Sequence, residues 1–293
     1  MIMPSIASPE ITIRTATIAD AQVCGLICYD AFAAISAAHG FPCDLPSPEV
    51  GIGLLSMMFS APGFYAVVAE SDGRIVGSNV ISEHAVIYGV GPITIDPKVQ
   101  NAGIGRKLME AVMDRAQRNG AAGVRLVQAA YHSRSLSLYA SLGFDVREPL
   151  ACLQGKTRER SVQGCLVRAA LPADEAACNA LARRVHGFDR GAELTHAIRE
   201  GSARVVVREN RVTGYSTHLG FFGHSTAETN VDMQALLASV ESFAGPGVLV
   251  PSRNSALLRW CLANGLRVVQ TMTLMSTGLY SEPAGAWLPS IVF

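Results

Sequence analysis

The sequence predicts an α+β protein of two domains, each a mixed, mainly antiparallel sheet flanked by helices. Three observations predict it. Alternating apolar runs joined by the turn Ser71-Asp72-Gly73 indicate an antiparallel hairpin. A strand–helix–strand crossover follows later in the first half. Motifs of the first half recur in the second, and 293 residues suit two domains of ordinary size as readily as one large one.

The first half is expected to open with a strand and two helices, continue as a meander and close with the crossover. The helix of the crossover carries its apolar residues along one face. In chain order, the predicted elements are strand 11–15, helices 19–39 and 47–59, strands 64–70, 74–83 and 86–95, helix 104–119, strand 123–129, helix 133–142 and a strand near 144–153.

Two echoes at different offsets indicate an internal repeat. The strand and turn that end in Asp20 recur 154 residues later at Asp174, where each Asp can cap the helix that follows. Gly143, placed to end a helix before a strand, recurs only 122 residues later as Gly265. The second copy is therefore shorter in its interior. We expect a boundary in the polar stretch 154–163, giving domains 1–155 and 156–293.

Composition excludes several classes of protein. Apolar residues make up 49% of the chain, which argues against disorder, and the 24 basic and 24 acidic residues argue against nucleic-acid binding. No apolar run is expected to reach the roughly 18 to 20 residues needed to span a bilayer, because charged or polar residues interrupt every candidate, and the N-terminus lacks the pattern of a secretion signal. Seven scattered cysteines without a C-x-x-C pair favour a reduced, cytoplasmic protein without a metal. The chain is expected to be a monomer or a homodimer that does not bind membranes.

The segment from Ile93 to Leu108 carries the clearest chemical signal. It reads as strand, loop and helix, with Gly103 and Gly105 at the helix start. Glycines let a ligand approach the backbone, and the first-turn N–H groups of a helix bind anions. Arg106 and its neighbour Lys107 add positive charge. The segment therefore predicts a phosphate or pyrophosphate site, although a plain helix-start turn and a solvated basic face are the alternatives.

Two familiar phosphate loops do not fit, and a third does. The segment lacks Gly-Lys-Ser/Thr, which excludes a Walker loop there, and Leu108 stands where a dinucleotide fingerprint needs glycine. Gln100-x-x-Gly103-x-Gly105, after a strand ending in Asp-Pro, resembles the acyl-CoA loop of the GCN5-related N-acetyltransferases (GNAT family). The pattern Ser133-x5-Tyr139-x2-Leu-Gly-Phe is similar to the closing helix of that family. The resemblance covers about residues 11–153.

The resemblance implies an enzyme that transfers an acetyl group from acetyl-CoA to a primary amine by direct attack. It places Tyr139 as the general acid that protonates the leaving thiolate, since a phenol with an ordinary pKa near 10 stays protonated. Tyr139 as a mere core aromatic is the alternative. Ser133 stands where the family often has Asn. The implied cofactor-binding residues are Ile93, Thr94 and Ile95 along the pantetheine arm, then Gln100, Asn101, Ala102, Gly103, Ile104, Gly105 and Arg106 at the pyrophosphate, and Ser133.

The general base is less clearly marked. An acceptor amine must lose a proton before it attacks, so a base is needed directly or through water. Glu83 and His84, at the end of a central strand, are the preferred candidates. His132, Asp96 and, more weakly, His39 are the others, and a surface role is the alternative for each.

The second copy keeps the fold signals and lacks the site. Its loop region, near residues 223–228, has no Gln-x-x-Gly-x-Gly, and Cys261 stands where the first copy has Tyr139. It is similar to the degenerate C-terminal domains of tandem GNAT proteins. We expect it to be non-catalytic and to wall the acceptor site, with Glu228, His224 or the carboxylate of Phe293 as candidate contacts.

Three functional classes follow from these patterns. The leading one is an N-acetyltransferase acting on a small-molecule or protein amine, and the neutral net charge disfavours a highly basic acceptor. A CoA- or metabolite-binding sensor would keep the loop and need no acid. A scaffold would not bind CoA at all.

Overall fold

The computed structural model describes residues 10–100 and 102–291 and divides the chain into two compact units. The first unit contains the chain up to Ile81 together with Pro92–Asn119. The second contains Ser82–Gly91 and the chain from Gly120 onward. Each unit is described by itself. The mixed α+β architecture with open sheets confirms the predicted fold class.

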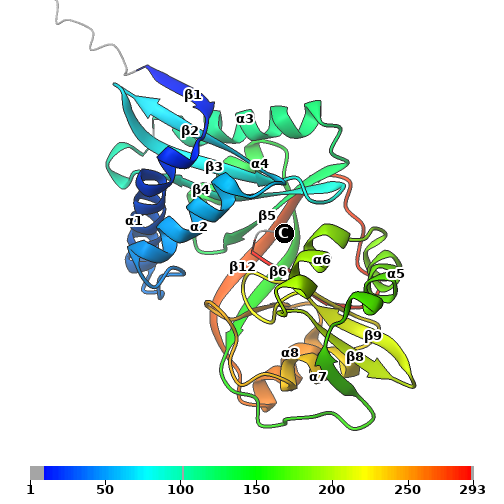
Figure 1. Cartoon of the computed structure of the whole chain (residues 1–293). Helices are drawn as coiled ribbons and strands as arrows, with labels where there is room; N and C mark the ends of the chain where they lie inside the picture. Colours follow the sequence, from blue (N-terminus) through cyan, green and yellow to red (C-terminus); the bar gives the residue numbers. More distant parts are fainter. Residues whose placement is uncertain (1–9, 101, 292–293) are drawn as a thin grey trace, which may run out of the picture. The chain divides into compact units, whose positions relative to one another are not determined.

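The first unit follows the predicted order of elements closely (Figure 1). Asp72 and Gly73 have φ angles of 50° and 72°, as the tight hairpin between the second and third strands requires. Its strands lie in the order β1-β2-β3-β4, and β4 enters from the second unit. The elements are β1 (Ile11–Thr15), α1 (Ala21–His39), α2 (Pro48–Ser60), β2 (Phe64–Ser71), β3 (Arg74–Ser82), β4 (Ile87–Ile95) and α3 (Ile104–Arg118), with short 3-10 turns at Ile18–Asp20 and Pro97–Val99.

Helices α1 and α3 cover opposite faces of this sheet. Ser78 on β3 contacts Cys24 of α1, whereas the next residue, Asn79, donates to the carbonyl oxygen of Leu108 on α3 at 3.2 Å. Successive residues of a strand point to opposite faces, so one helix lies on each side. Helices α1 and α2 meet so closely that a Cβ on Gly25 would lie 2.4 Å from the Cα of Ile52.

The second unit is larger and contains the rest of the chain. Its described elements begin with the first half of β4. A 3-10 turn at Pro172–Asp174 precedes the first helix of the second copy. The elements are β5 (Gly123–Ala129), α4 (Ser133–Ser141), β6 (Asp145–Gln154), β7 (Leu166–Ala169), α5 (Glu175–His186), α6 (Gly191–Arg199), β8 (Arg204–Arg208), β9 (Arg211–Ser216), β10 (Ser225–Ala227), α7 (Asn230–Ala238), β11 (Val248–Pro251), α8 (Ser255–Ala263), β12 (Arg267–Gly278) and β13 (Ala286–Leu288).

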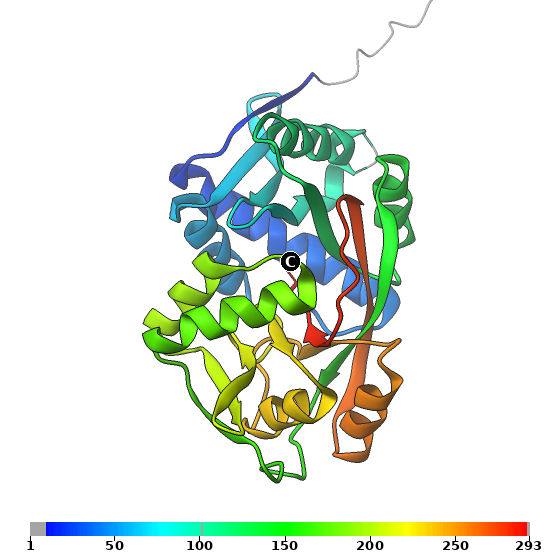
Figure 2. The same cartoon turned by 90° about the vertical axis from the view of Figure 1, so that its right-hand side faces the viewer.

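Strand β12, from the end of the chain, lies between β5 and β6 of the first copy (Figure 2). It is antiparallel to both: Leu274 lies opposite Val127 on β5 and opposite Glu148 on β6. The other edge of β6 pairs with β11. Strands that precede and follow the expected boundary at residue 155 therefore alternate in one sheet of this unit. Strand β5 also pairs in parallel with β4, over Ile87–Gly89.

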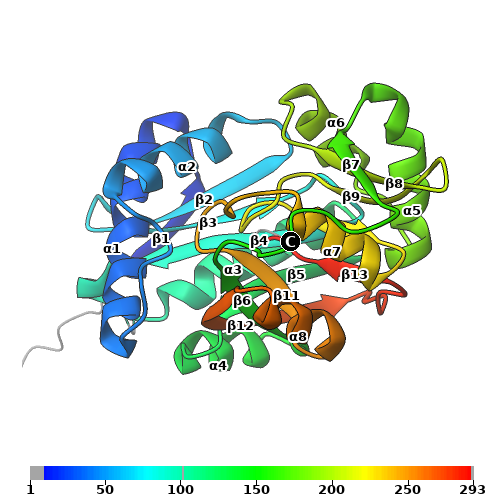
Figure 3. The same cartoon turned by 90° about the horizontal axis from the view of Figure 1, so that it is seen from below.

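A second sheet, in the order β13-β10-β9-β8-β7, carries helices on both faces (Figure 3). Val205 of β8 packs among buried residues of α5 and α6, whereas the next residue, Val206, packs with those of α7. Because successive side chains of a strand point to opposite faces, β8 contributes to two separate hydrophobic cores.

The sequence echoes correspond to repeated contacts. Arg14 donates two hydrogen bonds to Asp20 at 2.8 and 2.9 Å, and Arg168 does the same to Asp174 at 2.6 and 2.8 Å. Gly143 and Gly265 both have positive φ angles, 85° and 99°. Each follows a nine-residue helix, α4 or α8, as a left-handed C-terminal residue.

One helical stretch, Ile18–His39, is long and apolar enough to span a membrane, with a mean hydropathy of 1.5 over 18 residues, although Asp30 interrupts it. Only its length and composition identify this stretch as a candidate membrane span, and a third of the 18-residue window is buried in the protein. Cys24 and Cys28 on this stretch are fully buried, as in a core helix.

Candidate functional site

The loop after β4, in the first unit, is shaped by its own polar side chains. The Asp96 carboxylate accepts a hydrogen bond from the backbone N–H of Lys98 at 2.9 Å. The Gln100 side-chain amide donates to the carbonyl oxygen of Ile95 at 3.3 Å. These two side chains therefore hold the loop, and Asp96 is not placed as a free base. Asn101 lies outside the described residues.

Helix α3 starts without a side-chain cap. Gly103 occupies the N-cap position with φ at 75°, a left-handed conformation that suits glycine, and a Cβ there would meet nothing within 4 Å. Ala102 and Gly103 are exposed, while Ile104 and Gly105 are buried and anchor the first turn. The first-turn N–H groups of such a helix can bind an anion, helped by the helix dipole.

The corresponding helix of the second copy, α7, begins differently. Thr229 caps it, and the Thr229 hydroxyl accepts a hydrogen bond from the backbone N–H of Asp232 at 3.3 Å. The Asp232 carboxylate also accepts from Thr213 and from Arg208. At the start of α7 a side-chain cap and a buried carboxylate occupy the position at which α3 leaves its backbone N–H groups uncapped. The start of α7 is therefore a much poorer anion-binding site than the start of α3.

Two basic side chains lie on the first turns of α3. Arg106 forms an exposed ion pair with Glu110 one turn later, at 3.8 Å, and Lys107 donates to the carbonyl oxygen of Ile11 at 3.2 Å. Exposed pairs of this kind are weak, so both cations still contribute positive charge at this end of the helix.

Strand β4 leads into the loop with a local distortion. Gly91 has a φ of 139°, and Pro92 follows with no backbone N–H to donate. Ile93 and Ile95 are half-buried. The Thr94 side chain is buried, and within the described residues its hydroxyl has no hydrogen-bond partner. Since that hydroxyl is buried, Thr94 can offer a ligand its backbone more readily.

Tyr139 lies in the second unit, on α4, and is only 6% exposed. Its ring packs against Phe144, with 6.2 Å between ring centroids. Burial raises the pKa of Tyr139 to about 12, and the neighbouring Ser135 hydroxyl opposes this rise. Tyr139 is thus both a core aromatic and a phenol that stays protonated at neutral pH.

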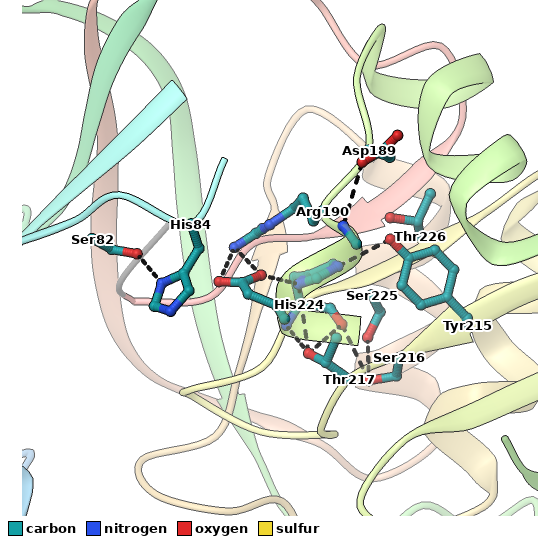
Figure 4. A network of polar contacts seen from close by, with 12 residues as sticks. Ser82, His84, Asp189, Arg190, Tyr215, Ser216, Thr217, His224, Ser225 and Thr226 are labelled. Carbon is teal, nitrogen blue, oxygen red and sulfur yellow. Dashed lines mark hydrogen bonds and ion pairs between the residues drawn. The ribbon is translucent and has the colours of Figure 1, made fainter. Parts of the chain in front are cut away.

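The candidate bases have different surroundings. Glu83 and His84 are half-buried in the connection between β3 and β4, where His84 Nδ1 hydrogen-bonds the Ser82 hydroxyl at 2.9 Å (Figure 4). Ser133 is the exposed first residue of α4. His39 is exposed, at the end of α1. The loop residues thus share the first unit, while Glu83, His84, Ser133 and Tyr139 share the second.

His224, a suggested acceptor contact, lies in a buried polar network of the second unit (Figure 4). Its Nδ1 lies 3.2 Å from a carboxylate oxygen of Glu193, which also pairs with Arg190 at 2.7 Å. Its Nε2 hydrogen-bonds the Tyr215 hydroxyl at 3.0 Å. Burial, and then the positive charge of Arg190, lowers the pKa of His224 to about 4. The ring is therefore neutral at pH 7.

The other suggested contacts are less informative. Glu228 accepts hydrogen bonds from Arg184 and Arg211, and these lower the pKa of its carboxyl. Phe293 lies outside the described residues. Cys261, the counterpart of Tyr139, is fully buried.

Two buried polar residues on β5 were not singled out from the sequence. Arg125 is buried between the rings of Phe188 and Tyr280, and burial together with the charge of Arg190 lowers its pKa to about 10. Gln128 is 6% exposed, and within the described residues neither amide atom has a hydrogen-bond partner. The sequence does mark these two residues, because both are polar residues within an otherwise apolar strand. Within the same residues no group of three or more His, Cys, Asp or Glu side chains could hold a metal.

Comparisons with known proteins agree with this architecture. The Acetyltransferase (GNAT) domain family matches residues 62–146, which include the α3 loop and Tyr139. Mycothiol acetyltransferase of Kocuria rhizophila is 32% identical over 97 residues, or 30% of this chain and 31% of that protein. The chain thus matches less than a third of the length of this curated relative.

Two solved structures match almost the whole chain. A putative acetyltransferase from Pyrococcus horikoshii has a TM-score of 0.69 at 18% identity, covering 98% of this chain and 97% of that one. A tandem GNAT protein from the clavulanic acid biosynthesis pathway has a TM-score of 0.57 at 16% identity, covering 92% and 98%. At these identities the likeness concerns the fold. Residues 62–146 therefore match the Acetyltransferase (GNAT) domain family, and the whole chain shares the fold of these two structures.

Proposed function

We propose that the protein transfers an acetyl group from acetyl-CoA to a primary amine of a small molecule or protein. The observation that carries this proposal is the open start of α3, where Gly103 replaces a side-chain cap and the loop before it is held by Asp96 and Gln100. A pyrophosphate supplies the negative charge that such a helix end stabilises. The named acetyltransferases among its relatives support an amine as the acceptor.

In this proposal each residue has a limited task. Backbone groups of Ile93–Ile95 hold the pantetheine arm, since the Thr94 side chain is buried. Backbone N–H groups from Gly103 onward hold the pyrophosphate, and Arg106 adds charge. Ser133, exposed at the start of α4, is a further cosubstrate contact. When bound, acetyl-CoA supplies an activated thioester.

Proton transfer is assigned to the second unit. Tyr139 donates its phenolic proton to the departing thiolate, for which its raised pKa keeps it protonated. Glu83 or His84, half-buried in the β3–β4 connection, accepts the amine proton directly or through water. The second copy, 156–293, is proposed to be a degenerate and non-catalytic GNAT-like domain. Its capped α7 and its Cys261 in place of tyrosine support this.

Seven free thiols fit a reduced cytoplasmic setting, which we also propose.

Release of free thiol from acetyl-CoA, measured with a panel of primary amines, tests the function. At least one amine should accelerate release over the no-amine rate, and mass spectrometry should find that amine heavier by one acetyl group. Tyr139→Phe should lower kcat by 10-fold or more and leave the KM for acetyl-CoA nearly unchanged. Binding of acetyl-CoA without turnover of any amine would instead support a CoA-binding sensor.

A further inference from the structure

A small, partly open pocket lies within the second unit and combines cationic with apolar walls. Arg125 of β5 and Arg190, at the N-cap position of α6, both line it. Among the described residues that line the pocket none is acidic. Its apolar wall is formed by Phe188, Leu274, Trp287, Leu288 and Pro289.

The two guanidinium groups of this pocket are buried. Arg125 is 3% exposed and Arg190 is 6% exposed. A buried cation costs free energy unless nearby groups compensate its charge. Glu193 compensates Arg190, at 2.7 Å, but the same carboxylate also lies 3.2 Å from Nδ1 of His224 (Figure 4). One carboxylate is thus shared between an arginine and an imidazole.

Neighbouring side chains respond to the positive charge of the pocket. Burial lowers the pKa of His186, which also lines the pocket, and the charges of Arg190 and Arg125 lower it further. Burial and the charge of Arg190 likewise lower the pKa of Arg125. An anion in the pocket would relieve this repulsion, so the pocket favours a negatively charged ligand.

The surroundings of Arg125 suit a flat anion. The carbon at the centre of its guanidinium lies 5.4 Å from the ring centroid of Phe188 and 5.2 Å from that of Tyr280. Aromatic rings contact the face of a guanidinium, whereas its N–H groups project within its plane and match the two oxygens of a carboxylate. A carboxylate is also small enough for a narrow pocket.

We propose that this pocket binds the carboxylate of a small apolar molecule, and that Arg125 recognises it. Arg190 adds positive charge, and the apolar wall contacts the rest of the ligand. Two sources have this chemistry. One is the amine acceptor itself, where it carries a carboxylate, and the other is a separate carboxylic acid.

Thermal unfolding with butyrate and with butanamide tests the need for a charge. The two probes have nearly the same shape, and only butyrate is an anion. Butyrate should raise the Tm of the unmodified protein in a saturable manner. Butanamide, and sodium chloride at equal ionic strength, should leave the Tm nearly unchanged. Equal shifts with butyrate and butanamide would overturn the proposal.

Two arginines that contact the same tyrosine ring provide matched variants. Arg147 lies 5.2 Å from the ring centroid of Tyr280, as Arg125 does, but it pairs with Asp145 at 2.9 Å and is not among the described residues that line the pocket. Arg125→Met should need about 10-fold more butyrate for a half-maximal shift. Arg147→Met should stay within twofold of the unmodified protein.

A third variant covers the case in which Arg125→Met does not fold. Arg125→Lys keeps the charge and loses the planar fork, so it should bind butyrate more weakly than the unmodified protein and more tightly than Arg125→Met. Circular dichroism establishes which variants fold. A folded variant of Arg125 that responds to butyrate as the unmodified protein does would contradict the proposal.

The thiol-release assay identifies the source of the carboxylate, and this part rests on the proposed function. Butyrate should raise the KM for the amine and leave kcat unchanged where the carboxylate belongs to the acceptor. An unchanged KM, with butyrate bound, assigns the pocket to a separate acid. Butyrate binding without any thiol release would remove the transferase and keep the site. Thiol release without butyrate binding would keep the transferase and remove the site.

Discussion

At the scale of single residues, burial decides which side chains keep their ordinary chemistry. His224 and His186 are both buried, and burial lowers the pKa of each, that of His224 to about 4. In an unfolded chain their pKa values return to about 6.5. The folded protein therefore binds fewer protons than the unfolded chain between these pH values, and acid favours unfolding.

The free energy of unfolding should consequently fall as the pH drops from about 6.5 to 4. His224 alone contributes about 3 kcal/mol over that interval if its full shift is expressed. His224→Gln should flatten the pH dependence measured by urea unfolding, whereas His39→Gln, an exposed position on α1, should leave it unchanged. An unaltered slope in His224→Gln would show that this ring does not stay neutral when folded.

At the scale of elements, the repeat is expressed in the caps of the first helices. Asp20 accepts hydrogen bonds from Arg14 and from the backbone N–H of Thr17, and Asp174 accepts from Arg168 and from the N–H of Leu171. These bonds lower the pKa of both carboxyls. Such carboxylates stabilise the fold above their usual pKa near 4, and the contribution is lost as the pH falls through the lowered value.

Asp20→Asn and Asp174→Asn should therefore each cost about 1–2 kcal/mol at pH 7, by similar amounts. The deficit should shrink when unfolding is measured below pH 4, because the carboxylates of the unfolded chain protonate there while the native ones, with lowered pKa values, protonate only at still lower pH. Asp72→Asn is the control, because the left-handed turn it occupies accepts Asn equally well. Unequal costs for Asp20→Asn and Asp174→Asn would contradict an equivalent role in the two copies.

Local patterns predicted most elements of the first half to within one or two residues. The hairpin at Asp72 and the helix start after Gly103 follow from residue chemistry that acts over a few positions. The insertion of β12 between β5 and β6 could not be predicted, because any two apolar strands of suitable length can pair. The same holds for the site. The α3 loop is visible in its glycines, whereas the burial of Tyr139 depends on how α4 packs.

At the scale of the whole molecule, the two sequence copies share one sheet in the second unit. Strand β5 pairs with β12 over seven residues, and β6 pairs with both β11 and β12. A chain cut after residue 155 would keep β5 and β6 but lose β11 and β12, which pair with them. Unpaired strands of this kind favour aggregation.

The fragment 1–155 should accordingly aggregate or unfold without cooperativity, as judged by size-exclusion chromatography and thermal unfolding. Co-expression with fragment 156–293 should restore a soluble complex with a cooperative transition. A monomeric 1–155 that unfolds cooperatively on its own would show that the first copy does not need β12.

The central claim is that the start of α3 binds the pyrophosphate of acetyl-CoA, and two glycines at the ends of this helix allow a direct test. Gly103 and Gly120 have φ angles of 75° and 70°, and a Cβ on either would meet nothing within 4 Å. Gly103→Ala and Gly120→Ala should thus suffer similar backbone strain, about 1–2 kcal/mol.

The deciding measurement is the Kd of acetyl-CoA for both variants by isothermal titration calorimetry. The account predicts that Gly103→Ala binds at least 10-fold more weakly than the unmodified protein, while Gly120→Ala binds within twofold of it. Equal affinity in the two variants, or no binding of acetyl-CoA by the unmodified protein, would contradict it.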